Sequence, residues 1–278
     1  MKKYTKNDEF FKIIDTEEKA YWLGAMYADG CVRNDKNIFF TSKDKDWVDS
    51  FLNAISYTGV ALKEIHSVYK TDCWKANITS KQMFDDLCYH GCVPNKSLIL
   101  KFPTINEELI PHFIRGYFDG DGTVGEYQNV KNSNSKTLRS GMCSGSKEFL
   151  EELVTHLPIK NKKLYKSTSV WTINLSVKDS ISFAKYIYNN ATVYLSRKKI
   201  IFDNAIQRRS ETIIAGPKSR TKEYAKQYYH KNKEHIRELQ LQYREKKLAY
   251  MREYNKRPEV IARRKGSRNS PISHESVS

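Results

Sequence analysis

Residues 22–30 read WLGAMYADG, and residues 114–122 read IRGYFDGDG. Each stretch places two small residues four positions apart and ends in Asp-Gly, and the final aspartates, Asp29 and Asp121, are 92 positions apart. Residues i and i+4 lie on one face of an α-helix. Two helices with small residues on that face can approach each other unusually closely. The pattern therefore predicts two abutting helices, each ending in a carboxylate.

Two adjacent helix ends that both carry an acid form a candidate cation site. Gly30 and Gly122 can take the left-handed conformation that commonly follows a helix. A carboxylate at a helix C-terminus adds negative charge to the negative end of the helix dipole, and two such ends increase this cost unless a divalent cation lies between them. Mg²⁺ prefers carboxylate, carbonyl and water oxygens, often with a substrate phosphate. Either motif alone would fit an ordinary helix stopped by Asp-Gly, a common turn pair.

The two motifs belong to a longer internal repeat, which favours a site over two unrelated helix ends. The segments WKANITS (residues 74–80) and WTINLSV (residues 171–177) match closely. Hydrophobic periodicity predicts the same order of elements in each half. The predicted pairs are strands 37–42 and 138–144, helices 45–55 and 147–157, and helices 81–89 and 178–188. We predict an α+β protein made by duplication of one unit.

Both motifs resemble those of the LAGLIDADG homing endonucleases, in the single-chain form that carries two motifs. The resemblance covers roughly residues 15 to 210, and the second motif fits better, because Tyr27 replaces an earlier aspartate in the first. It implies two pseudo-symmetric αββαββα halves whose motif helices form the interface. It also implies a catalytic divalent ion, Mg²⁺ or Mn²⁺, held at a metal site made of Asp29, Asp121, Gly30 and Gly122.

The resemblance and the composition together divide the chain into four parts. A Gly-Pro-containing stretch at residues 215–219 marks the end of the duplicated region. The predicted parts are an N-terminal half at 1–105, a C-terminal half at 106–214, a basic helical tail at 215–265 and a disordered end at 266–278.

Lys96 and Lys198 occupy corresponding places near the end of each half. In the family, a lysine in this setting lies next to the scissile phosphate, one for each half-site. A positive charge there would stabilise the charge that develops on the phosphoryl oxygens and help to position the attacking water. Both residues could instead be ordinary surface lysines, and in the second half Lys199 or Arg197 could serve in place of Lys198.

The charge of the chain agrees with a nucleic-acid partner. It carries 48 Lys and Arg against 32 Asp and Glu, a formal net charge of +16, and phosphate contacts provide most non-specific affinity for nucleic acids. Residues 1–216 carry 31 basic and 25 acidic side chains, so most of the excess lies in the tail. Sequence recognition is therefore expected from the sheets, because the major groove admits a two-stranded ribbon.

The strands near 31–42, 62–78, 123–143 and 160–176 are expected to cover helices with one face and to offer the other to a DNA groove. The candidate DNA-contacting residues on the free face are Arg33, Asn34, Lys36, Lys63, Lys75, Lys136, Arg139 and Lys166. Ser42 and Ser144, at strand ends, are candidates for positioning water or contacting DNA. Each of these residues could also be an ordinary solvated surface group.

The tail shows a periodic pattern of its own. Aromatic or aliphatic residues recur in i, i+4 pairs, as at Tyr224 and Tyr228, among 16 basic and 6 acidic residues between positions 217 and 265. This pattern favours one or two basic helices, with Pro258 breaking or restarting the last. We expect an accessory arm that lies along phosphates, although a solvated charged tail would show the same composition.

Five cysteines without paired two-residue spacing indicate a reducing compartment such as the cytoplasm or an organelle, and argue against a disulfide scaffold or a structural zinc site. Cys88 and Cys92, one helical turn apart, are better explained by core packing. No signal peptide and no membrane helix are expected, since there is no 18-residue apolar span. The chain also lacks intein terminal residues, so a free-standing enzyme is expected.

Three functions fit these patterns. The leading hypothesis is a monomeric endonuclease that cuts both strands of a long, asymmetric DNA target, because the two halves differ in sequence. The family also implies a role in spreading the mobile gene that encodes the enzyme. The alternatives on the same scaffold are an RNA maturase that binds intron RNA and a non-catalytic DNA-binding regulator. Paired carboxylates favour the endonuclease, because a protein that only binds phosphate has no need of them.

Overall fold

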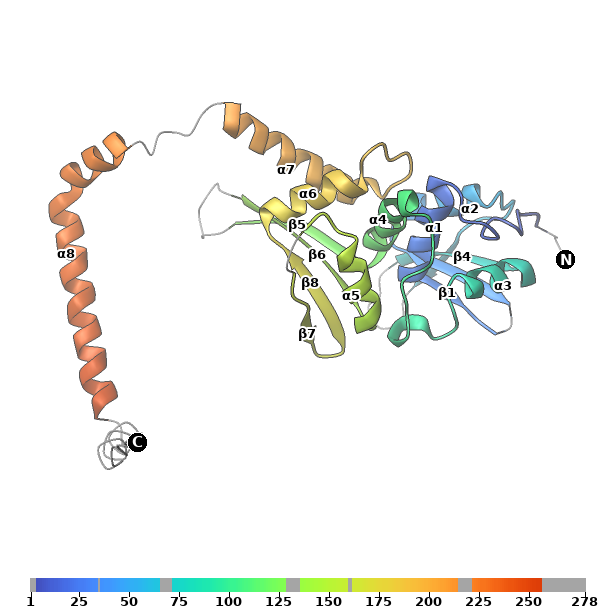
Figure 1. The fold of residues 1–278 in the computed structure, drawn as a ribbon, viewed down its shortest axis with the longest axis horizontal. Helices are drawn as coiled ribbons and strands as arrows, with labels where there is room; N and C mark the ends of the chain where they lie inside the picture. Colours follow the sequence, from blue (N-terminus) through green and yellow to red (C-terminus); the bar gives the residue numbers. More distant parts are fainter. Residues whose placement is uncertain are drawn as a thin grey trace, which may run out of the picture. The chain divides into compact units, whose positions relative to one another are not determined.

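The computed structural model of this protein describes residues 4–34, 36–65, 72–128, 136–159, 162–214 and 222–256 (Figure 1). The chain divides into two compact units, residues 1–210 and 211–278. The first unit contains both motif helices and both sheets. Pro258 and the predicted disordered end at 266–278 lie outside the described residues, as does the predicted boundary at 215–219.

The first half runs through the predicted order of elements. Its elements are α1 (Glu17–Ala28), β1 (Gly30–Val32), β2 (Asn37–Ser42), α2 (Lys45–Ala54), β3 (Leu62–Ile65), β4 (Asp72–Thr79), α3 (Lys81–Tyr89) and the short 3-10 helix η1 (Lys96–Leu98). The predicted strand 37–42 and helix 81–89 agree with β2 and α3 at both ends.

The second half repeats this order. Its elements are η2 (Glu107–Leu109), α4 (Ile110–Asp121), β5 (Gly122–Gln128), β6 (Lys136–Ser144), α5 (Lys147–Thr155), β7 (Tyr165–Ser167), β8 (Val170–Leu175), α6 (Val177–Ile187) and α7 (Ser196–Ile214). In the tail, α8 (Lys222–Asn255) is a single long helix. The predicted α+β fold with two αββαββα halves is confirmed.

Serine side chains determine where equivalent helices of the two halves begin. Ser80 precedes α3, and its Oγ accepts a hydrogen bond from the Met83 N–H at 3.2 Å. Ser176 caps α6 in the same way, one position earlier in the repeat than Ser80. Such a cap satisfies an N–H that has no partner within the helix and contributes about 1 kcal/mol. In each half a serine thus follows the central strand and starts the next helix.

Each half contains a four-stranded antiparallel sheet, with the order β1-β2-β4-β3 in the first and β5-β6-β8-β7 in the second. The registers are equivalent. Gly30 pairs with Phe40 on β2, and Gly122 pairs with Met142 on β6. The halves are therefore related residue by residue, which allows a role found in one half to be sought in the other.

The two motif helices pack against each other between the sheets (Figure 1). A Cβ placed on Gly24 would lie 2.0 Å from the Phe113 carbonyl oxygen, and one on Gly116 would lie 1.9 Å from the Tyr21 carbonyl oxygen. Any side chain at either position would collide with the backbone of the facing helix. This confirms the close approach that the small-residue spacing predicts, and it brings the two helix ends together.

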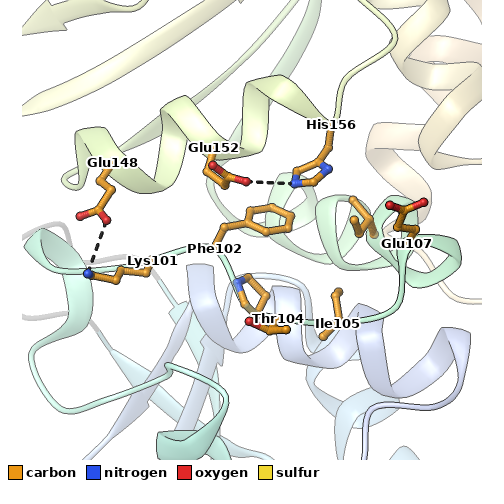
Figure 2. Close-up of a pocket in the computed structure, with 10 residues that line it drawn as sticks. Lys101, Phe102, Thr104, Ile105, Glu107, Glu148, Glu152 and His156 are labelled. Carbon is orange, nitrogen blue, oxygen red and sulfur yellow. Dashed lines mark ion pairs between the residues drawn. The ribbon is translucent and has the colours of Figure 1, made fainter.

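The segment between the halves forms a pocket of about 460 Å³ with α5 (Figure 2). Phe102 stacks on His156 with ring centroids 4.6 Å apart, and the lining includes Glu107, Glu148 and Glu152. Neither motif aspartate lines this pocket. Its glutamates would repel a phosphate, so the nucleic-acid site has to be sought elsewhere.

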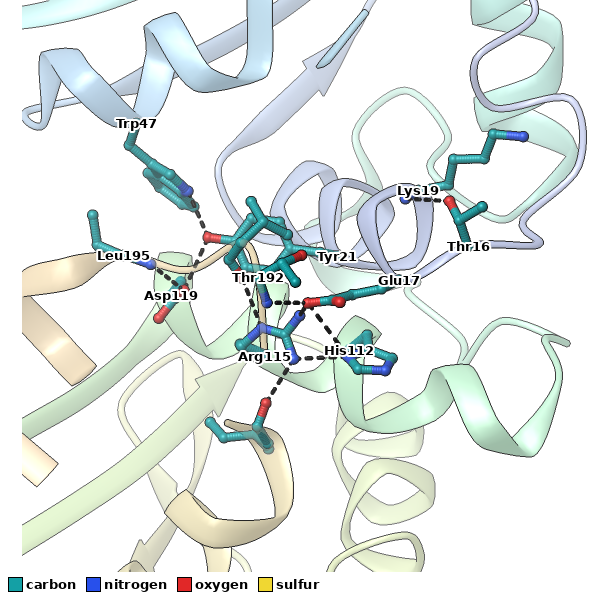
Figure 3. Close-up of polar contacts among 12 residues, drawn as sticks. Thr16, Glu17, Lys19, Tyr21, Trp47, His112, Arg115, Asp119, Thr192 and Leu195 are labelled. Atoms are coloured by element: carbon teal, nitrogen blue, oxygen red, sulfur yellow. Dashed lines mark hydrogen bonds and ion pairs between the residues drawn. The ribbon is translucent and has the colours of Figure 1, made fainter. Parts of the chain in front are cut away.

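A buried arginine joins the two halves at the other ends of the motif helices (Figure 3). Arg115 in α4 is fully buried, and its guanidinium donates to the Glu17 carboxylate of α1 at 2.6 Å and to the Ile187 carbonyl oxygen at 2.6 Å. The same Glu17 carboxylate accepts from the Thr192 N–H at 2.7 Å. The buried Arg115 guanidinium thus has an opposite charge and further acceptors, as a buried ion requires, and its partner Glu17 is partly buried. Among the described residues, no helix is long and apolar enough to cross a membrane.

Candidate active site

The structure brings the two predicted acids together. Asp29 caps the C-terminus of α1, with its N–H bonded to the Ala25 carbonyl oxygen at 2.9 Å, and Asp121 is the last residue of α4. A Cβ on Gly120 would lie 3.1 Å from Asp29 Oδ2. The Asp29 carboxylate therefore lies against the last turn of the opposite motif helix, directly before Asp121.

This position is electrostatically strained in the free protein. Burial, and then the charge of Asp121, raise the pKa of Asp29 to about 6. Burial also raises the pKa of Asp121, although Lys96, Lys198 and the Tyr117 hydroxyl act in the opposite direction. In the described part of the chain, no side chain donates a hydrogen bond to the Asp29 carboxylate. Two partly buried carboxylates thus share one region, and the oxygen atoms of Asp29 accept no hydrogen bond from a described side chain.

Both predicted lysines lie at this centre in equivalent positions. Lys96 and Lys198 are only 8% and 4% exposed. Lys96 donates to the Gly30 carbonyl oxygen, and Lys198 donates to the Gly122 carbonyl oxygen at 2.5 Å and to that of Phe118 at 2.7 Å. A cation bonded to the last carbonyls of a helix offsets the negative end of its dipole. The lysines therefore hold the motif ends and place a positive charge beside each aspartate.

In the second half, the structure separates the three basic candidates. Lys199 donates to Asp203 at 2.6 Å, and the Arg197 Nε donates to Asp44 at 2.9 Å, so both are engaged away from the motif. Lys198 is the member of the trio that bonds to the motif helix. Burial lowers its pKa to about 8, partly opposed by nearby aspartates.

The predicted conformation of the motif glycines is wrong. Gly122 has φ −83° and ψ 155°, which is extended backbone, and Gly30 is likewise outside the left-handed region as the first residue of β1. The chain passes from each helix directly into a strand, so no left-handed residue is needed. Glycine is required for space instead. A Cβ on Gly30 would lie 2.5 Å from the Met26 carbonyl oxygen, and a Cβ on Gly122 would lie 2.4 Å from the Phe118 carbonyl oxygen.

The donor set suits a small, hard divalent cation that is completed by its substrate. Among the described residues, no group of three or more His, Cys, Asp or Glu side chains is placed to hold a metal ion. Mg²⁺ is commonly bound through one or two carboxylates, with waters and substrate phosphate filling the rest of its shell. Asp29 and Asp121 match that requirement, and the Gly30 and Gly122 carbonyls are occupied by lysines.

The earlier acidic position of the motif has a different role. Asp119 is buried in α4 and accepts hydrogen bonds from the Tyr21 hydroxyl at 2.9 Å and the Leu195 N–H at 2.7 Å (Figure 3). It also accepts one from the Tyr188 hydroxyl at 3.1 Å. Burial raises its pKa to about 6 despite these donors. In the first motif, Tyr27 at this position donates to a backbone carbonyl. This position therefore anchors the surrounding loops, and sequence reasoning did not identify that role.

The strand registers place the predicted sheet residues on two different faces. Directly paired residues share a face, and neighbours along a strand alternate. Lys75 and Arg139 lie between core-facing residues of β4 and β6, and therefore point away from the helices. Arg33, Asn34 and Lys36 lie at the β1–β2 turn. DNA contact by these five residues stays a prediction.

For three lysines, the predicted free face is wrong. Lys63 pairs with Trp74 and Lys166 pairs with Trp171, and both tryptophans pack against the core. Lys136 lies two residues before the buried Leu138, on the same side of β6. A shift of one residue in the alternation moves a side chain to the opposite face. Lys63 and Lys166 lie on the short edge strands β3 and β7, which have too few apolar residues to determine the alternation, and Lys136 is the first residue of β6.

Ser42 and Ser144 lie at equivalent strand ends. Ser42 pairs with Trp74, and its Oγ accepts from the Asp44 N–H at 3.2 Å. The Oγ of Ser144 accepts from the Ser146 N–H at 3.1 Å. Both hydroxyls stabilise the turn before the following helix. A contact with water or DNA remains a prediction.

Known proteins with a similar fold were found among solved structures. Similar solved structures are LAGLIDADG homing endonucleases and the LAGLIDADG-like domain of WhiA. The homing endonuclease I-WcaI bound to its DNA recognition sequence is 17% identical, with a TM-score of 0.47 over 70% of this chain and 90% of that one. Full-length DUF199/WhiA from Thermatoga maritima is 17% identical, with a TM-score of 0.44 over 73% of this chain and 65% of that one.

Sequence comparison adds one curated relative. A probable translation initiation factor IF-2 of Methanocaldococcus jannaschii is 29% identical over 170 residues. The match covers 53% of this chain and 13% of that protein, so this chain corresponds to a small part of the relative's length. No protein-family model matches the chain.

Proposed function

We propose that this protein is a divalent-metal-dependent, site-specific DNA endonuclease that hydrolyses one phosphodiester bond in each strand. The observation that carries the proposal is the meeting of Asp29 and Asp121 at the ends of two abutting helices, with a buried lysine beside each one. A fold gains no stability from two partly buried acids placed together, one of which accepts no hydrogen bond from a described side chain. Such an arrangement is explained by a cation and an anionic substrate that complete it.

The aspartates and the lysines at this centre have different proposed roles. Asp29 and Asp121 would hold Mg²⁺ or Mn²⁺, which acts as a Lewis acid on the phosphodiester and its attacking water when bound. Lys96 and Lys198 fix the helix ends, and their charges oppose the rise in the pKa of Asp29. Both carboxylates are partly removed from solvent, and this strengthens the electrostatic interactions there.

The duplicated scaffold accounts for the kind of substrate. Two equivalent sheets, each with a face free of helices, provide two recognition surfaces in one chain, and a two-stranded ribbon fits the major groove. Because the two surfaces differ in sequence, the expected target is long and asymmetric. One chain contains both halves, so a monomer is expected to be sufficient. A role of such cleavage in homing of an intron or another mobile gene is part of the proposal.

Cleavage by the purified full-length protein tests the proposal. The substrate is DNA from the gene's own locus with any intron removed, incubated with and without Mg²⁺. Wild type is compared with Asp29→Asn and Asp121→Asn, and with Asp85→Asn as a control, since Asp85 is a surface acid paired with Lys81. We expect double-strand breaks from wild type and the control, and intact or nicked DNA from the motif variants with DNA binding retained.

The outcomes separate the three hypotheses. Specific binding of this DNA without any cut by wild type would favour a regulator. Binding of intron RNA in preference to DNA, again without a cut, would favour a maturase. Cleavage that persists in both motif variants would show that Asp29 and Asp121 are not its centre.

A further inference from the structure

One polar residue occurs at the same place on the helix-free face of both sheets. Asn77 on β4 pairs with Phe39 on β2, and Asn174 on β8 pairs with Gly141 on β6. Both lie between buried residues of their strands, so both point away from the helices. The two sheets have equivalent strand orders and registers, and the two asparagines are therefore related by the pseudo-symmetry of the halves.

Neither the Asn77 nor the Asn174 carboxamide stabilises the fold through a hydrogen bond with a described residue. Both asparagines are exposed, and in the described part of the chain no residue hydrogen bonds to either side-chain amide. Asn77 accepts one bond through its backbone carbonyl, from the Tyr57 hydroxyl at 3.3 Å. A Cβ on Gly141 would lie 3.2 Å from Asn174 Oδ1, so the glycine leaves room for that amide. Two free amides thus stand on otherwise well-packed strands.

The cations around them are already engaged with the surface. Lys75 lies 4.5 Å from the centre of the Phe39 ring and 3.4 Å from the Glu64 carboxylate. The Arg139 guanidinium lies 5.7 Å from the centre of the Tyr127 ring. A lysine also acts on DNA mainly as a point charge for phosphate. The two amides, by contrast, have no protein partner among the described residues and remain available to a base edge.

We infer that Asn77 and Asn174 each recognise one adenine in the major groove, one in each half of the target. An asparagine side chain donates through its NH₂ group to adenine N7 and accepts through its oxygen from the adenine N6 amino group, and this bidentate pair distinguishes A·T from the other base pairs. The inference rests on the proposed DNA-directed function. Because the two residues are pseudo-symmetric, the two A·T pairs lie at equal distances from the centre of a target that is otherwise asymmetric.

Binding selection from a randomised DNA duplex library tests this assignment. The full-length protein is used without divalent ions, so that DNA is bound but not cut, and the bound duplexes are sequenced. The variants are Asn77→Ala, Asn174→Ala and Asn77→Arg. The control is Asn53→Ala, an exposed asparagine on α2, which packs on the other face of the sheet.

Wild type and the control should enrich two adenines at equal distances from the centre of the site. Asn77→Ala should weaken the adenine preference on one side by about 5- to 150-fold, and Asn174→Ala should weaken it on the other side by a similar factor. Asn77→Arg should change the preferred base at its position from adenine to guanine, because arginine is bidentate to guanine O6 and N7. Identical base preferences in wild type and both alanine variants would overturn the inference and leave DNA recognition intact. A wild-type protein that enriches no sequence would overturn the proposed site-specific function as well.

Discussion

At the scale of single residues, Asp29 is held where a cation suits it better than the protein alone does. Its folded-state pKa of about 6 lies above the ordinary value of 3.8, chiefly because of burial and then because of Asp121. Between these two values the folded protein binds a proton that the unfolded chain has already released. The free energy of unfolding therefore falls as the pH rises through this window, and the full penalty is present at pH 7.

Removing this charge should stabilise the metal-free protein. We expect Asp29→Asn to raise the free energy of unfolding at pH 7 by about 1 to 3 kcal/mol. The pKa of Asp29 is raised from 3.8 to about 6, and one pKa unit corresponds to about 1.4 kcal/mol. Urea denaturation in EDTA measures this difference. Below pH 4 the gain should disappear, because wild-type Asp29 is then protonated in both states. A variant less stable than wild type at pH 7 would contradict the electrostatic account.

The same carboxylate should make metal affinity depend on pH. A proton and the cation compete for Asp29, so the affinity for Mn²⁺ should fall about tenfold for each pH unit below 6, where the proton is bound in the free protein. Isothermal titration calorimetry at several pH values between roughly 4.5 and 7.5 measures how the Mn²⁺ affinity depends on pH. An affinity that does not change across this range would show that Asp29 is not a ligand.

At the scale of the elements, the motif helices depend on the absence of side chains at their crossing. Gly24→Ala or Gly116→Ala would place a methyl group about 2 Å from a carbonyl oxygen of the facing helix. Overpacking of this kind costs about 1 to 3 kcal/mol or more, and thermal unfolding should show the decrease in stability. The control is Gly125→Ala, whose Cβ would meet only the end of the Tyr127 side chain, at 2.9 Å. An equal decrease in the control would mean that close helix packing is not the cause.

The elements also show what the sequence could and could not reveal. Periodicity predicted β2 and α3 to the residue, because strong alternation or an amphipathic face marked each one. The acids could be paired from the sequence because the repeat fixes their equivalence. The faces of Lys63 and Lys166 could not, since β3 and β7 lie at sheet edges, where every described residue is exposed and no apolar alternation remains. The bonds of Lys96 and Lys198 depend on chain segments far apart in sequence.

At the scale of the whole molecule, Arg115 joins the two halves from inside. Its guanidinium pairs with Glu17 of the first half and bonds to carbonyl oxygens of the second. Arg115→Met would keep the volume but leave these carbonyls without their donor and Glu17 without its ionic partner, and breaking a buried ion pair costs about 3 to 5 kcal/mol. The control, Lys199→Met, removes a surface pair and should cost less than about 1 kcal/mol. Similar decreases in stability for the two variants in chemical denaturation would contradict a buried link between the halves.

The tail should add affinity for DNA without adding specificity. Residues 217–265 carry 16 basic and 6 acidic side chains, and α8 presents basic residues on a helix belonging to the second compact unit. Truncation after Gly216 removes this charge and keeps both halves. The slope of log affinity against log salt should fall by about 0.9 for each phosphate that the tail neutralises, so a tail that neutralises three phosphates would account for about 2.7 of the slope. Fluorescence anisotropy with a labelled duplex across a KCl series measures the slope. Truncation after Lys265, which removes one basic and one acidic residue, is the matched control and should leave the slope unchanged. If the two truncated proteins bind alike at every salt concentration, the basic helix does not bind DNA.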